Sequence, residues 1–161
     1  MAKITPLSLY IINQVIYRAY VIGLFQENFS IVLDKSSSYV NNIFSEKLNA
    51  VFASTDYQLI ADALKWETHD LLPPSETSYN DGTLVDKKVF SLINPEDTER
   101  VILGMIKNNY FNNDRSLDDI FNHLYLVKNN AHPKKRKVVY EVLTKIVESG
   151  GLKLVKDKYS V

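Results

Sequence analysis

The sequence predicts a mainly α protein in two parts, a bundle of five helices followed by a smaller unit of three helices and a β-element. Apolar residues recur at three- and four-residue spacing along most of the chain, which is the periodicity of amphipathic helices. Pro73 and Pro74, followed by a polar, turn-rich stretch, interrupt this pattern near the middle. At 161 residues with 45% hydrophobic content, the chain can bury the core of one domain or of two small ones.

The first helix of the bundle is predicted from the spacing of its apolar residues. Leu7, Ile11 and Val15 fall on one face of a helix. Gly23 is the expected C-terminal cap, because glycine readily adopts the left-handed conformation in which many helices end. An amphipathic helix over this segment would bury one face against the rest of the bundle.

Two short helices separated by a polar turn are expected next. Residues 26–33 hold the apolar side chains of the second helix. Ser36 or Ser37 is the expected N-cap of the third, because a serine hydroxyl accepts a hydrogen bond from an amide of the first turn, and this helix ends near Phe44. Two short helices joined at a tight polar turn, the second with small polar side chains, have the layout of a helix-turn-helix reader of DNA.

The rest of the bundle is predicted to be an irregular stretch and two further helices. Residues 45–54 are polar, and their larger apolar residues are expected to tether them to the core: Leu48, Val51 and Phe52. Residues 57–65 form the fourth helix and residues 66–72 a short fifth helix, which the two prolines end. The first domain therefore covers residues 1–74.

A linker is expected over residues 75–94. Its first half is polar, and Asn80-Asp81-Gly82 is a turn signal. Its second half, residues 84–93, is apolar enough for a short strand or for an extended tether, and the pattern leaves both open. The second domain then covers residues 95–161.

The second domain is predicted to contain three helices and a β-element. Pro95 suits the first turn of the first helix, and Ser116 with Asp119 resembles a capping box that opens the second. Pro133 begins the third helix, which two successive glycines end. Residues 152–161 alternate enough for one strand or a tight hairpin. This order is the outline of a winged helix, although a plain helical bundle fits the same periodicity.

Short matches to a known family are distributed over residues 7–72, under half of the chain. They are Gly23-Leu24, Gln26-Glu27, Phe29, Leu33, Lys35-Ser36, Ser38-Tyr39-Val40 and Ile43. With these residues the segment resembles the helix-turn-helix domain of the XRE/lambda-repressor family of DNA-binding regulators, and residues 57–64 look like the family's fourth helix. Asp34 stands where the family favours glycine.

The resemblance implies which residues would contact DNA. Gln26 would contact a phosphate, while Lys35 and Lys47 would hold the sugar-phosphate backbone. The residues facing the major groove would be Ser36, Ser37, Asn41 and Asn42. Asparagine pairs bidentately with adenine and serine serves either base, although serines at a helix start are also ordinary caps.

Charge is unevenly distributed along a chain whose net charge is zero. Residues 1–75 hold five lysines and arginines against seven acids, whereas residues 129–161 hold eight against three. The densest cationic run lies where the third helix of the second domain begins, and three of its members are candidate DNA contacts: Lys134, Lys135 and Lys137. Cations gain affinity for DNA by displacing phosphate counterions, but a solvated helix face or an acidic protein surface explains the same run.

The sequence favours a binding protein over an enzyme. Cysteine is absent, the three histidines lack metal-ligand spacing, and no glycine-rich phosphate loop occurs. We therefore expect no catalytic residue, no metal and no cofactor. No uninterrupted run of about 18 apolar residues exists, and the first residues do not form a cleavable signal, so a cytoplasmic location without membrane contact is predicted.

The predicted function is that of a sequence-specific transcriptional regulator that reads the major groove of double-stranded DNA with the third N-terminal helix. Operators read by such bundles are commonly two-fold symmetric, so a homodimer is expected. The alternative is a protein-interaction adaptor that has the helix-turn-helix shape, binds a protein partner with that surface and does not bind DNA on its own. The acidic balance of the N-terminal part favours the adaptor, and the asparagines and serines of the third helix favour DNA reading.

Overall fold

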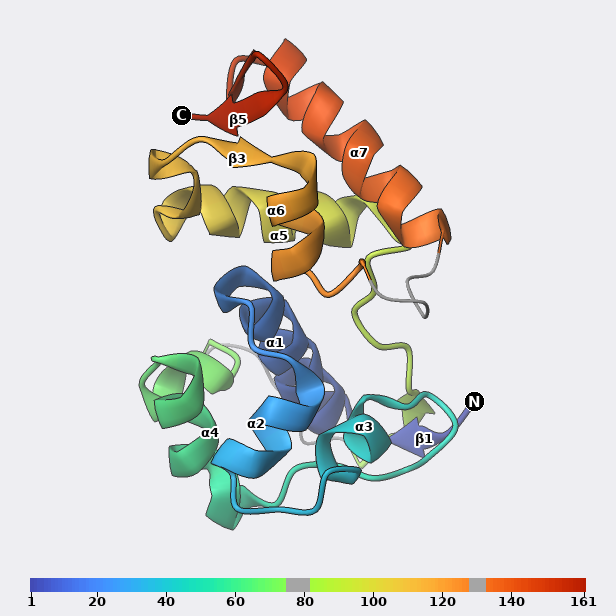
Figure 1. Cartoon of the computed structure of the whole chain (residues 1–161). Coiled ribbons are helices and arrows are strands. Elements are labelled where there is room, and N and C mark those ends of the chain that lie inside the picture. The colour runs from blue at the N-terminus through green and yellow to red at the C-terminus, as the bar shows by residue number, and fades with distance from the viewer. Residues whose placement is uncertain (75–81, 128–132) are drawn as a thin grey trace. The chain divides into compact units, whose positions relative to one another are not determined.

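The fold is mainly α, as the periodicity predicts. The structure is a computed structural model that describes residues 1–74, 82–127 and 133–161 (Figure 1). Within these ranges the chain forms seven α-helices, three 3-10 turns and five short strands. Two compact units are present: unit 1 contains Met1–Ala19 and Leu24–Phe90, and unit 2 contains Tyr20–Gly23 and Ser91–Val161.

Unit 1 combines four α-helices with two 3-10 turns and a small sheet in its described residues. In chain order the elements are β1 (Lys3–Ile4), α1 (Pro6–Ile22), α2 (Gln26–Val32), α3 (Tyr39–Phe44), η1 (Ser54–Asp56), α4 (Tyr57–Leu64), η2 (Thr68–Leu71) and β2 (Val85–Asp86). The expected fifth helix is only the 3-10 turn η2. The strand-or-tether alternative resolves as a two-residue strand, because β2 pairs antiparallel with β1, with Val85 opposite Ile4.

The expected linker is divided between the two units. Its residues 75–81, with most of the turn signal, lie outside the described part of the chain. Residues 82–90 belong to unit 1 and residues 91–94 to unit 2. The backbone amide of Phe90 donates to the side-chain oxygen of Asn13 at 2.8 Å, which fixes this segment against α1.

The apolar face of α1 contributes to the core of unit 1. Ile11 and Val15 of the predicted face are at most 1% exposed, and Leu7 is half-buried. The helix ends at Ile22, and Gly23 follows with φ of 70°, so the predicted glycine cap is confirmed.

The turn between α2 and α3 places the start of α3 later than predicted. Asp34 adopts φ of 53°, the left-handed conformation that glycine prefers and that aspartate tolerates. The prediction that Ser36 or Ser37 caps α3 is wrong: Ser38 takes the N-cap position without a side-chain cap hydrogen bond. The hydroxyl of Ser30, fully buried in α2, instead accepts from the amide of Val40 at 3.1 Å.

A buried lysine holds the irregular stretch after α3. The prediction that Leu48 and Val51 tether this stretch is wrong, because they are 45% and 38% exposed, whereas Phe52 is buried as expected. Lys87, fully buried, donates from Nζ to the carbonyl oxygens of Leu48 at 2.8 Å and Ala50 at 2.7 Å. Burial lowers the pKa of Lys87, and the two carbonyls provide its buried amino group with hydrogen-bond acceptors.

Unit 2 contains three helices and a three-stranded sheet in its described residues, besides the end of α1. Its elements are α5 (Pro95–Lys107), η3 (Tyr110–Asn112), β3 (Arg115–Ser116), α6 (Leu117–His123), α7 (Pro133–Glu148), β4 (Lys153–Val155) and β5 (Lys158–Ser160). Helices α5 and α7 pack against each other (Figure 1), and the buried residues of these two helices include Ile102, Met105 and Leu143.

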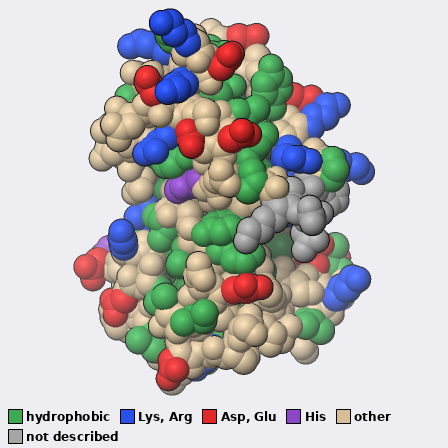
Figure 2. Space-filling view, in the orientation of Figure 1, with side chains coloured by type: hydrophobic (Ala, Val, Ile, Leu, Met, Phe, Trp, Pro, Cys, Tyr) green, Lys and Arg blue, Asp and Glu red, His purple; other side chains and the backbone are tan. Residues whose placement is uncertain are grey.

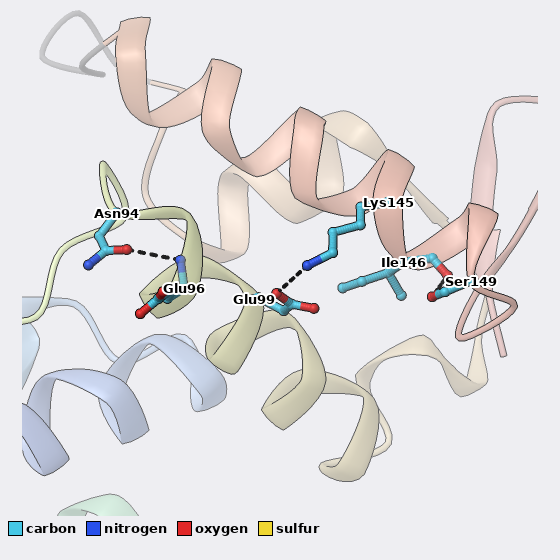
Figure 3. A network of polar contacts seen from close by, with 6 residues as sticks. All are labelled: Asn94, Glu96, Glu99, Lys145, Ile146 and Ser149. Carbon is cyan, nitrogen blue, oxygen red and sulfur yellow. Dashed lines mark hydrogen bonds and ion pairs between the residues drawn. The ribbon is translucent and has the colours of Figure 1, made fainter.

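Local signals determine the starts of the three helices. Pro95 is in the first turn of α5, and the side chain of Asn94 accepts from the amide of Glu96 at 2.9 Å (Figure 3). The capping box at α6 is confirmed, because Ser116 and Asp119 each accept a hydrogen bond from the other's backbone amide. Pro133 is the first residue of α7, as predicted.

The end of the chain is a hairpin that joins a third strand. The sheet order is β3-β5-β4, with both pairs antiparallel. Gly150, at φ of 80°, turns the chain after α7. Lys156 and Asp157 have φ of 49° and 60°, and positive φ at both residues of a two-residue loop is characteristic of a type I′ hairpin turn.

Side chains at the end of α6 cap the last turn of α1. A ring nitrogen of His123, Nε2, lies 3.0 Å from the carbonyl oxygen of Val21, and the hydroxyl of Tyr125 donates to the carbonyl of Gly23 at 3.1 Å. The ring of His123 also packs at a tilt of 50° against that of Tyr110, with centroids 4.4 Å apart. These contacts satisfy carbonyl groups that a helix end leaves without partners.

Candidate nucleic-acid interface

Helix α7 carries the basic run at its start, and the helical periodicity determines which of these cations are exposed and which is partly buried. Lys134, Arg136 and Lys137 are exposed. Lys135 is half-buried, because it precedes the buried Val139 by four residues and so shares the inward face of the helix. This burial lowers the pKa of Lys135. Three of the four cations are therefore directed to solvent.

The outward face of α7 is a mixed surface. The side chains of Lys137 and Glu141 are 76% and 58% exposed, and Lys137 Nζ lies 3.7 Å from Glu141 Oε1. Tyr140 is 52% exposed beside them. Thr144, one turn further, is exposed, and its hydroxyl donates to the carbonyl of Tyr140 at 3.0 Å. This face presents donors, an acceptor and an aromatic ring together.

The hairpin β4–β5 adds further cations after α7. Lys153, Lys156 and Lys158 are exposed, and Lys158 pairs with Val155 across the hairpin. Leu154 and Val155 are 47% and 61% exposed. Figure 2 shows lysine and arginine side chains at this end of unit 2, with acidic side chains between them.

The acidic residues of unit 2 are concentrated on α5 and α6. Glu96 and Asp97 lie in the first turn of α5, and Asp118 and Asp119 in the first turn of α6, where negative charge is stabilised by the helix dipole. An ion pair joins α5 to α7, with Lys145 Nζ 2.8 Å from Glu99 Oε2 (Figure 3). Five of the nine acids of unit 2 thus lie on α5 and α6, whereas α7 and the hairpin together hold eight cations and three acids.

Helix α3 in unit 1 presents two amides to solvent. Val40 and Ile43 face the core with at most 1% exposure, and Asn41 and Asn42 are exposed on the other side. Helix α2 ends nearby in sequence with two exposed apolar side chains, Ile31 at 68% and Val32 at 57%. The α2–α3 segment therefore turns a corner and directs both asparagines outward.

The candidate contact Lys35 is engaged by a buried carboxylate. Lys35 Nζ lies 3.3 Å from Asp56 Oδ1 and 5.5 Å from the ring centroid of Tyr39. The hydroxyl of Tyr39 donates to Asp56 Oδ2 at 3.0 Å. Burial, with the hydrogen bond and the charge of Asp56, raises the pKa of Tyr39 to about 12. A phosphate would have to compete with Asp56 for this lysine.

The remaining candidates of unit 1 occupy separate positions along and after the α2–α3 segment. Gln26 is half-buried at the start of α2, and its backbone carbonyl accepts from Ser30 at 3.1 Å. The hydroxyl of Ser36 lies 3.4 Å from that of Ser38. Ser37 and Lys47 are exposed.

Reasoning from sequence missed several residues of this surface. Arg136, Tyr140 and Glu141 were not among the candidates, although the period of α7 places them outside its buried stripe. The same period was the available signal that Lys135 faces inward. The engagement of Lys35 by Asp56 had no signal in the sequence, because the pair is brought together by the path of the chain between α3 and η1.

The described residues contain neither a metal-binding cluster nor a helix that could span a membrane by itself. No group of three or more histidine or acidic side chains lies close enough together to hold a metal ion within residues 1–74, 82–127 and 133–161. In the same ranges, no single helix is long and apolar enough to cross a membrane. Helices α1 and α2 have the required length and apolar character only when taken together, and they are bent by 106° relative to each other.

Comparison with protein-family models, with curated proteins and with solved structures found no match to this chain.

Proposed function

We propose that this chain is a DNA-binding transcriptional regulator, and that unit 2 is a winged helix whose helix α7 enters the major groove. The observation that carries the proposal is the element order α5-β3-α6-α7-β4-β5 combined with the sheet order β3-β5-β4. In a winged helix the third helix is the reading helix and the terminal hairpin is the wing. Here those two elements carry the basic residues.

The charge distribution supports the same assignment. Residues 133–161 hold eight cations and three acids, whereas residues 94–127 hold three cations and six acids. Cations at the start of a helix are disfavoured by the helix dipole, so Lys134, Arg136 and Lys137 do not stabilise α7 by their position. A polyanion bound at this end of α7 would compensate for that local cost.

Unit 1 supplies the second reading surface of the proposal. In this proposal its α2–α3 segment, two short helices joined by a polar turn, acts as a helix-turn-helix like that of the XRE/lambda-repressor family, with Asn41 and Asn42 reading adenine. A homodimer on a two-fold symmetric site, in the cytoplasm, is part of the same proposal. Catalysis has no role in it.

The test of the proposal is the salt dependence of binding to random-sequence duplex DNA. Each cation that neutralises a phosphate adds about 0.9 to the steepness of log K against log salt, so Lys134→Ala with Arg136→Ala should weaken binding and reduce the slope by about 1.8. Lys65→Ala with Lys107→Ala removes two exposed cations outside α7 and the wing, and should leave the slope unchanged. Absence of binding at low salt contradicts the proposal.

The contribution of α3 is tested separately. Asn42→Ala should weaken binding to a selected sequence by about tenfold while leaving affinity for random duplex unchanged, because base contacts specify and phosphate contacts do not. Equal losses of affinity on both kinds of DNA would contradict a reading role for α3.

A protein-interaction adaptor is the second candidate function, and one observation favours it. Ile31 and Val32 are exposed on α2, while the nearby Lys35 is paired with Asp56. Apolar side chains exposed next to one another and bordered by polar residues, here the exposed Glu27 and Asp34, are a feature of protein-binding surfaces. If duplex DNA is not bound at any salt concentration, this candidate becomes the leading one.

A further inference from the structure

We propose that Lys137 and Glu141 act together as a reader of one C·G base pair; this inference rests on the proposed binding of duplex DNA by α7. In the major groove, cytosine presents its N4 amino group as a donor and guanine its O6 and N7 as acceptors. Glu141 accepts the hydrogen bond from cytosine, and Lys137 donates to guanine.

The geometry of the two side chains matches that of the base pair. Lys137 Nζ and Glu141 Oε1 are 3.7 Å apart on the outward face of α7, and both side chains are more than half exposed. Cytosine N4 and guanine O6 are hydrogen-bonded neighbours about 2.9 Å apart. One donor and one acceptor at comparable separation can therefore meet one acceptor and one donor on the same base pair.

The pair is poorly arranged to stabilise the helix, which argues against a purely structural role. Glutamate four residues before lysine is the favourable order for such a pair, and here Lys137 precedes Glu141. Its lysine, the fifth residue of α7, also lies far from the C-terminal turn, where the helix dipole would stabilise a cation. An exposed pair of this kind contributes little to stability in any case.

The carboxylate is also out of place on a surface that only binds phosphates. Helix α7 holds two acids, Glu141 and Glu148, against five cations, and Glu141 is the one that lies within one turn of the basic run. A carboxylate close to the DNA backbone would weaken non-specific binding by repulsion. In contact with a cytosine amino group it gains a hydrogen bond that a thymine, with an acceptor at the same place, cannot give. Glu141 is therefore the expected source of discrimination.

The test selects binding sites from a random duplex library with the full-length chain and two variants. Wild type should enrich sites with one fixed C·G pair, and Glu141→Gln should lower the preference for that pair about tenfold while affinity for random duplex stays the same or rises. Glu148→Gln is the matched control, because Glu148 lies on the same helix face two turns further on and should keep the preference. Circular dichroism verifies that both variants are folded.

The outcomes separate this inference from the proposed function. If the chain binds no duplex DNA at low salt, both are overturned. If wild type binds duplex DNA, and either Glu141→Gln keeps the preference or Glu148→Gln loses it equally, the reading pair is overturned while DNA binding stands.

Discussion

Replacing Gly23 by alanine perturbs unit 2 in two ways that can be separated. At φ of 70° an alanine is strained by about 1–2 kcal/mol. In addition, a Cβ at this position would lie 2.8 Å from Cε1 and 2.9 Å from Nδ1 of the His123 ring. Displacing a packed ring costs about 1–3 kcal/mol. We therefore expect Gly23→Ala to lower the free energy of unfolding of unit 2 by about 2–5 kcal/mol.

Gly150→Ala is the matched control for backbone strain. Gly150 lies in the same unit at φ of 80°, and a Cβ there would meet no atom within 4 Å. Its substitution should cost only the strain, about 1–2 kcal/mol. The difference between the two variants measures the clash with His123. Adding His123→Ala to Gly23→Ala should recover this difference, as a coupling energy of about 1–3 kcal/mol.

Urea unfolding combined with hydrogen exchange provides the assay. Exchange is followed by mass spectrometry in peptides of unit 2, because the chain has two units and a single probe would mix their transitions. If Gly23→Ala is no more destabilising than Gly150→Ala, or if removing the His123 ring gives no recovery, the close contact between Gly23 and this ring is refuted.

Three further predictions concern buried polar groups. Burial lowers the pKa of His123 below 6.5, so its neutral form stabilises unit 2 fully above pH 6.5. This stability is lost as the pH falls through the lowered pKa. In urea unfolding between pH 7.5 and pH 5, the free energy of unfolding should therefore fall less for His123→Gln than for the wild type. Asp56→Ala should destabilise unit 1 by about 1.5–3 kcal/mol, because Tyr39 and Lys35 lose a charged partner, and Asp56→Asn should destabilise it less. Trp66 fluorescence during urea unfolding measures both variants. Equal destabilisation by the two substitutions would contradict the role of the charge. Lys87→Met should speed hydrogen exchange at residues 48–50, because the carbonyls of Leu48 and Ala50 lose their donor. Unchanged exchange there would refute the role of Lys87 in holding this stretch.

Local signals explain the features that were predicted correctly. The glycine after α1, the proline at the start of α5 and the Ser116–Asp119 capping box each act within a few residues along the chain. The helix period also marked the inward faces of α1 and α7. Such features depend on near neighbours, so the order of residues is sufficient to specify them.

The candidate site was predictable only in part for the same reason. The basic run and the outward direction of Asn41 and Asn42 follow from composition and period. The cap of α3 was misassigned because Ser30, ten residues before Val40, supplies the hydroxyl from another helix. Capping rules consider only residues next to the helix start, so they cannot identify a serine on the preceding helix as the hydrogen-bond acceptor.

By itself, the sequence determined a mainly α chain with a basic C-terminal helix and hairpin. Only the tertiary structure decided which polar groups are engaged: Lys35 by Asp56, Lys87 by two backbone carbonyls, and His123 by the carbonyl of Val21, 102 residues away. Helix period and capping are set by interactions between near neighbours in the chain. Partners from distant segments are set by how the helices pack, and that packing is a property of the whole fold.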